Sequence, residues 1–165
     1  MRVAILLLLA AVPVARICAF RTVRLHIGWG ELALWMLGAV VILAVYKAAS
    51  EFLGGLIPDT QLGGYPRPTG SAQLIDLTFG LMLTATQEEI FFRRFARAAV
   101  RRFGDGGLMV IMTSVVFALF HWWNGIPNVI LAGLAGAYLM LLYRRAGALW
   151  PCIAAHYAID VWCFL

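Results

Sequence analysis

Long apolar stretches follow one another along almost the whole chain, with short polar connections between them. The candidate helices are residues 3–20, 32–57, a segment from about 71 to 103, and residues 108–123, 127–143 and 148–165. A helix needs about 20 apolar residues to cross a bilayer core. The chain is 63% hydrophobic and 13% charged, whereas soluble domains are about one quarter charged. We therefore predict an all-α polytopic membrane protein with about six transmembrane helices.

Two polar connections divide this series of helices. Residues 58–70 (PDTQLGGYPRPTG) are dense in Pro and Gly, which predicts a loop and not a helix. Residues 104–107 (GDGG) are expected to end the third helix. The length fits one domain. Within it we expect residues 1–70 to supply two N-terminal helices and a loop, and residues 71–165 to form a membrane core that contains helices three to six.

The first apolar stretch has two interpretations. Arg2, the apolar run after it and the small residues that follow are similar to a signal peptide. Arg16 disfavours a cleavage site made of small residues. We therefore predict a retained helix over residues 3–20, with Pro13 as its kink.

The basic residues lie in alternate connections, which predicts an orientation. Ten of the thirteen Lys and Arg residues fall between helices one and two, three and four, or five and six: Arg16, Arg21, Arg24, Arg93, Arg94, Arg97, Arg101, Arg102, Arg144 and Arg145. Basic loops stay in the cytoplasm, so both termini are predicted to be non-cytoplasmic in a multi-pass protein, in a bacterial inner membrane. Basic residues placed between apolar runs do not indicate nucleic-acid binding.

Two adjacent carboxylates, Glu88 and Glu89, follow the apolar part of the third helix. Glu89 has Arg93 four residues later, which is the favourable order for a helical ion pair. Glu88 points about 100° away and has Phe92 at the same spacing. Because a charge within a membrane costs roughly 2.5–3.5 kcal/mol on insertion scales, an acid without a local cation indicates a function. The alternative is two interfacial acids that balance an arginine-rich helix end.

Three further ionisable residues lie within apolar segments. His121 ends the fourth helix, and His156 and Asp160 lie four residues apart on one face of the sixth. Ionisable residues within membrane segments are candidates for a functional site. Asp160 is expected to orient the imidazole of His156 and to fix its tautomer.

Helix geometry places these residues at similar heights. If residues 104–107 form the tip of an antiparallel hairpin, Glu88 and His121 both lie about 21–24 Å from that tip. His156 is about 16 Å from the arginines that precede the sixth helix. The three residues are therefore expected to converge in one cavity, where a carboxylate and two imidazoles would supply a base for water and polar groups for an oxyanion.

The chain resembles the CPBP intramembrane proteases. The resemblance rests on three motifs within about residues 74–165: Glu-Glu-x-x-x-Arg (Glu88, Glu89, Arg93), Phe-x-x-x-His (Phe117, His121) and His-x-x-x-Asp (His156, Asp160). This family includes type II CAAX prenyl endopeptidases, lysostaphin-resistance-protein-A-like proteins and bacteriocin-processing proteins. It often carries Asn where this chain has Asp160.

The resemblance implies roles for the motif residues. Glu88 would activate water, Glu89 and Arg93 would hold the helix in place, and His121 would polarise the scissile carbonyl or hold the water. His156 and Asp160 would complete the site. The substrate would be a protein or peptide with a lipidated or hydrophobic C-terminal segment: a prenylated CAAX protein, a peptide pheromone or a C-terminal sorting tag.

Three alternatives remain open from the sequence. A zinc-dependent protease would use Glu88, His121 and His156 as ligands, but no HExxH spacing is present, so we favour a mechanism without a cofactor. A non-catalytic immunity or partner protein of a bacteriocin or secretion system would keep the same fold. A proton-coupled transporter is disfavoured because the chain shows no inverted repeat.

Overall fold

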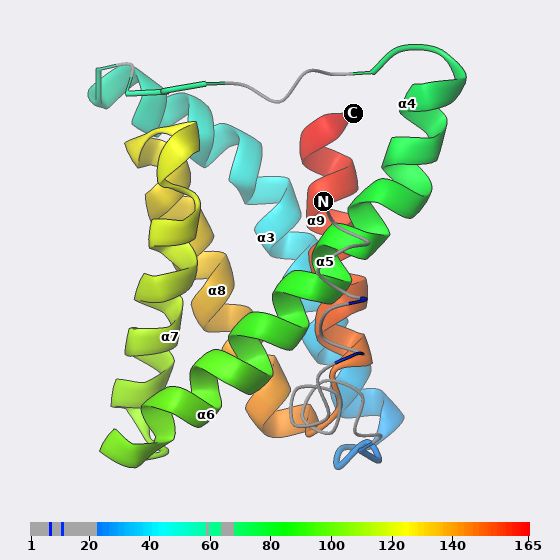
Figure 1. The fold of residues 1–165 in the computed structure, drawn as a ribbon, viewed down its shortest axis with the longest axis vertical. Coiled ribbons are helices and arrows are strands. Elements are labelled where there is room, and N and C mark those ends of the chain that lie inside the picture. The colour runs from blue at the N-terminus through cyan, green and yellow to red at the C-terminus, as the bar shows by residue number, and fades with distance from the viewer. Residues whose placement is uncertain (1–6, 8–10, 12–22, 59, 64–67) are drawn as a thin grey trace.

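The computed structural model describes Leu7, Ala11 and residues 23–58, 60–63 and 68–165. In this part of the chain every regular element is a helix, so the predicted all-α class is correct (Figure 1). The first predicted helix, its kink at Pro13 and the signal-peptide alternative lie outside the described residues.

The helix α3 covers Trp29–Leu56 and corresponds to the second predicted span. It is the longer of two described helices whose length and hydropathy suffice to cross a membrane; the other is α8, Ile126–Ala146. The remaining helices of the described chain are shorter or interrupted, as with α7, Gly107–Phe120. The six-span path therefore remains a prediction.

The third predicted helix is one continuous helical run in which the winding changes. Its parts are α4 (Ser71–Ile75), the π-helix η1 (Asp76–Gly80), α5 (Leu81–Glu89), the π-helix η2 (Ile90–Ala96), α6 (Arg97–Val100) and the 3₁₀-helix η3 (Arg101–Phe103). Gly104 ends the run at φ 119°, a conformation that favours glycine. Single π-turns inside helices are frequent at functional sites, and η2 directly follows the two glutamates.

The helices α7 and α8 form a second hairpin, joined by the 3₁₀-helix η4 (Trp122–Asn124). Gly136 on α8 lets the two helices approach closely, because a Cβ there would lie 2.9 Å from Cδ1 of Phe117. Small residues at such contacts are typical of helix packing in membranes. The last helix, α9 (Trp150–Phe164), packs against α5, α8 and α3.

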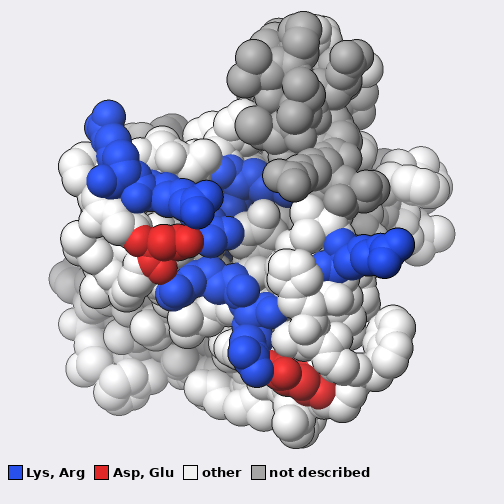
Figure 2. Space-filling model, turned by 90° about the horizontal axis from the view of Figure 1, so that it is seen from below, with Lys and Arg blue, Asp and Glu red and all other residues white. Residues whose placement is uncertain are grey.

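Most of the arginines that the structure describes gather at one end of the molecule (Figure 2). The helical run of residues 71–103 ends there, α7 begins there, and α8 ends there (Figure 1). Seen from that end, the surface is crossed by basic side chains, with acidic groups between them (Figure 2). Arg97 donates to Asp105 at the hairpin tip, at 3.1 and 3.0 Å, and this guanidinium lowers the pKa of Asp105. Arg145 pairs with Glu31 at the start of α3.

Candidate active site

A buried ion pair anchors the site. Arg93 donates from Nε to Oε2 of Glu89 at 2.7 Å and from a terminal nitrogen to Oε1 at 3.0 Å. Both side chains are fully buried. Arg93 also donates to the backbone carbonyl of Gly136 at 3.2 Å and lies over the ring of Phe117. The pair predicted from the four-residue spacing thus joins η2 to both α7 and α8.

The same carboxylate also holds His156. Nδ1 of His156 lies 2.9 Å from Oε1 of Glu89. Because Arg93 keeps Glu89 in the role of an acceptor, Nδ1 of the imidazole carries the proton and donates it. The four-residue spacing predicts Asp160 in this orienting role, and here the structure differs, because Glu89 bonds Nδ1. Glu89 comes from another helix and reaches the far side of the ring.

Asp160 instead faces the nitrogen on the cavity side. Its Oδ1 lies 3.6 Å from Nε2 of His156. The residues share one face of α9, as their spacing predicts, but the ring is turned so that Nε2 and not Nδ1 meets the acid. Asp160 is therefore placed to interact with Nε2 of His156, the ring nitrogen that faces the cavity. It does not set the tautomer of this imidazole.

His121 is oriented by the end of its own helix. It is the C-cap residue of α7, and its backbone N–H bonds to Ala118 in place of Phe117. This tighter last turn leaves the carbonyl of Phe117 for the side chain, and Nδ1 of His121 donates to it at 2.8 Å. Both imidazoles thus use Nδ1 to bond the protein and turn Nε2 toward the cavity.

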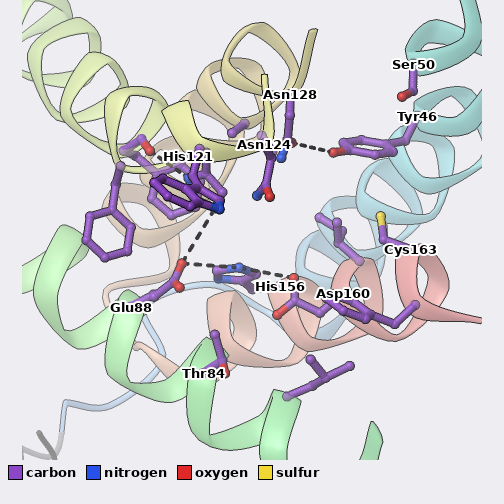
Figure 3. Close-up of a pocket in the computed structure, with 18 of the residues that line it drawn as sticks. Tyr46, Ser50, Thr84, Glu88, His121, Asn124, Asn128, His156, Asp160 and Cys163 are labelled. Carbon is purple, nitrogen blue, oxygen red and sulfur yellow. Dashed lines mark hydrogen bonds and ion pairs between the residues drawn. The ribbon is translucent and has the colours of Figure 1, made fainter. Parts of the chain in front are cut away.

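Glu88 lies between the two imidazoles. Its Oε2 atom is 3.9 Å from Nε2 of His121 and 3.9 Å from Nε2 of His156 (Figure 3). These distances are too long for direct hydrogen bonds, and they leave the three groups directed at one common point. The structure therefore brings together Glu88, His121 and His156, which come from α5, the end of α7 and α9.

Phe117 forms the packed wall behind these groups. Its ring centroid lies 4.6 Å from that of His121 and 5.7 Å from that of His156, and it meets Phe92 edge-to-face at 4.8 Å. Only 2% of Phe117 is exposed. This aromatic cluster limits rotation of both imidazoles and keeps the polar groups apart from the apolar helix contacts.

The candidate catalytic side chains line a cavity of about 800 Å³. The opposite wall carries polar residues that belong to none of the three motifs. Tyr46 donates its hydroxyl proton to Asn128 at 2.9 Å, and the amide of Asn124 points into the cavity beside them (Figure 3). A signal was present, since amides near the start of the apolar α8 segment are intramembrane polar groups, but only the fold shows which cavity they face.

The donor types around Glu88 are those that zinc takes. Two imidazoles whose Nδ1 atoms bond a carboxylate and a carbonyl resemble metal-ligating histidines, and a carboxylate oxygen completes the set. Two donors that share a zinc ion lie at most about 4 Å apart, so separations of 3.9 Å are at the outer limit. Among the described residues no group of three or more His, Cys, Asp or Glu is recognised as a metal site.

The chain matches a known protein family. The model of the family described as Rce1-like, "Type II CAAX prenyl endopeptidase Rce1-like", matches residues 70–162. This range contains every candidate catalytic residue named above. No curated protein and no solved structure matches the chain.

Proposed function

The chain belongs to the Rce1-like family of type II CAAX prenyl endopeptidases, and on that premise we propose that it is an intramembrane endopeptidase. It hydrolyses a peptide bond near the C-terminus of a membrane-associated or lipidated protein. The observation that carries the proposal is the position of Glu88. Its carboxylate faces Nε2 of two imidazoles in a cavity large enough for a peptide segment.

In the proposed reaction Glu88 acts as the general base. It removes a proton from a water molecule held between its Oε2 atom and the imidazoles, and the water oxygen bonds to the scissile carbonyl carbon. The tetrahedral intermediate places negative charge on the former carbonyl oxygen. When the C–N bond breaks, the protonated Glu88 returns the proton to the leaving amine. The products are a new carboxylate and a new amino terminus.

The two imidazoles have different roles, with His156 as the donor to the oxyanion. An imidazole that already donates from Nδ1 donates from Nε2 as well when it is an imidazolium. At His156 that positive charge would be surrounded by the carboxyl groups of Glu88, Glu89 and Asp160. A donor fixed toward the developing charge contributes about 10²–10³ in rate. His156 is oriented by Glu89 and would meet this requirement as an imidazolium. His121 donates from Nδ1 to the carbonyl of Phe117, so its neutral ring presents an acceptor at Nε2 and is placed to hold the attacking water.

A zinc ion, if bound, would be held by Glu88, His121 and His156 and would supply Lewis-acid activation of water. The fixed Nδ1 atoms serve that arrangement equally well, because they direct both Nε2 atoms at one point. The proposal without a cofactor assigns the base role to Glu88 itself. Removal of metal ions with a chelator distinguishes the zinc-dependent mechanism from the mechanism without a cofactor.

The test is a comparison of protein C-termini in membranes. Cells that express the wild-type chain and cells that express Glu88→Gln at matched levels are analysed by mass spectrometry of C-terminal peptides. We expect shortened C-termini with the wild type and their loss with the variant. Asp105→Asn, which changes a carboxyl at the remote hairpin tip, is the matched control and should retain processing.

Identical C-termini in wild-type and Glu88→Gln membranes would overturn the proposal. A non-catalytic partner or immunity protein with the same fold would then account for the chain, since such a role needs the helices but no base.

A further inference from the structure

Four uncharged polar side chains stand between the catalytic cavity and a second, smaller one. The second cavity has a volume of about 280 Å³ and lies beside the C-terminal end of α3 and the start of α8. The residues that line both cavities are Ser50, Gln61, Asn124 and Asn128. We call this group the polar neck. Its members connect the space around Glu88 to one end of the helices.

The polar neck is held together by contacts between distant segments. Thr60 accepts a hydrogen bond from the backbone N–H of Ile126 at 2.8 Å, and Leu62 donates its backbone N–H to the carbonyl of Trp123 at 3.1 Å. These contacts fix the described segment after α3 against the α7–α8 connection. Tyr46 holds Asn128. The neck is therefore a built opening and not a chance gap between helices.

The neck and the arginine-rich end lie on opposite sides of the molecule. Asn128 stands at the start of α8, while Arg144 and Arg145 stand in its last turn. Sixteen residues separate Asn128 from Arg144, or about 24 Å of helix. The helical run of residues 71–103 places four more exposed or half-buried arginines at that same end: Arg94, Arg97, Arg101 and Arg102.

Basic charge near the neck is sparse in the described chain, where Glu51 directly follows Ser50 on α3. Ser50 lies nineteen residues beyond Glu31 on α3, and Glu31 is paired to Arg145 at the arginine-rich end. Of the basic residues that the structure describes, Lys47 lies nearest the neck along α3. Basic groups next to membrane segments remain in the cytoplasm. The arginine-rich end is thus expected on the cytoplasmic side and the neck on the other.

We propose that the substrate enters through the polar neck from the extracytoplasmic side, so that the substrate class is the C-terminal segment of an exported, membrane-anchored protein. A prenylated protein of the cytoplasmic leaflet would meet the arginine-rich end instead. This inference rests on the proposed proteolytic function and deepens it.

The chemistry of the neck suits an extended peptide. Its amides and hydroxyl offer both donors and acceptors without charge, and an extended chain needs partners for each backbone N–H and C=O once it leaves water. Further inside, the cavity is lined by apolar side chains, among them Leu81, Phe120, Leu139 and Ile159. A substrate with a polar junction followed by an apolar segment would match this order of surfaces.

The test of entry side is thiol labelling. In a chain whose natural cysteines are replaced by Ala, Ser50→Cys and Gln61→Cys report the neck, and Arg101→Cys reports the arginine-rich end, where 69% of that side chain is exposed. With a membrane-impermeant maleimide on intact cells, we expect both neck variants to react and Arg101→Cys to react only after permeabilisation. The two neck positions guard against failure of one variant to fold.

The reverse pattern, with the neck variants protected until permeabilisation and Arg101→Cys labelled from outside, would overturn the inference. This measurement does not depend on activity. Mass spectrometry of C-terminal peptides from membranes supplies a second, independent test. The proteins shortened only by the wild type should be exported proteins, and shortening confined to prenylated cytoplasmic proteins would contradict the entry side while leaving the protease proposal intact.

Discussion

His156 and Glu89 form a hydrogen bond of 2.9 Å between Nδ1 and Oε1, and this bond joins the buried ion pair to the catalytic cavity. Glu89 therefore has two partners, since it also holds Arg93. The group that secures the helices also fixes the imidazole. Substitution of Glu89 is expected to lower both the stability and the activity of the protein, whereas substitution of Glu88 should lower its activity alone.

Glu88→Gln and Glu89→Gln should therefore differ in kind. Glu88→Gln keeps the side-chain shape and removes the base, so activity should fall by about 10²–10⁴ with no loss of folded protein. Glu89→Gln leaves Arg93 buried without its anionic partner, which costs about 3–5 kcal/mol. Activity of the purified variants tests the effect of Glu88→Gln, and thermal unfolding in detergent tests the loss of stability in Glu89→Gln.

Asp105→Asn is the matched control for Glu89→Gln. It removes the anion from an exposed ion pair with Arg97, and such pairs are worth about 0–1 kcal/mol. Equal destabilisation by Asp105→Asn and Glu89→Gln would contradict the anchoring role of the buried pair.

Asp160→Asn should have a smaller effect than Glu88→Gln. Because Asp160 faces Nε2 and Glu89 holds Nδ1, the tautomer of His156 survives the change. We expect a folded protein with reduced kcat and a KM close to that of the wild type. His156→Ala removes the imidazole itself and should be inactive. If Asp160→Asn were as inactive as His156→Ala, the assignment of the orienting role to Glu89 would be wrong.

Gly136→Ala should loosen the contact between α7 and α8. The new Cβ would lie 2.9 Å from Cδ1 of Phe117, a ring that also packs on both catalytic imidazoles. Overpacking of this kind costs about 1–3 kcal/mol, and activity should fall with stability. Gly54→Ala is the control, because a Cβ at Gly54 meets nothing within 4 Å. Unchanged thermal stability in Gly136→Ala would show that the helices shift freely.

Treatment with a chelator distinguishes the two mechanisms that share this geometry. If Glu88 acts as a base without a metal, the purified protein should keep its activity in phenanthroline. Loss of activity that is restored by zinc would reassign Glu88, His121 and His156 as metal ligands. Glu88→Gln would be inactive under either mechanism, so the chelator experiment is the one that decides.

The local relationships within each helix follow from the sequence. The four-residue spacing of Glu89 and Arg93 placed them on one helix face, and the glycines at 104 and 107 ended one helix and began the next at similar distances from Glu88 and His121. These features depend on helical periodicity and on backbone preferences, which act over a few residues. The number of membrane spans remains a prediction from apolar length, because only α3 and α8 meet the length criterion within the described chain.

Contacts between side chains of different helices depend on how those helices pack. Periodicity put His156 and Asp160 on one face, but the rotation of α9 against α5 determined that Glu89 takes Nδ1 and Asp160 takes Nε2. The same is true of Tyr46, which lies far from the motifs in sequence, and of Asn124 and Asn128, which follow His121. All three line the same cavity. Such contacts depend on the relative rotation and approach of packed helices, which residues such as Gly136 set through their size, and no local spacing encodes them.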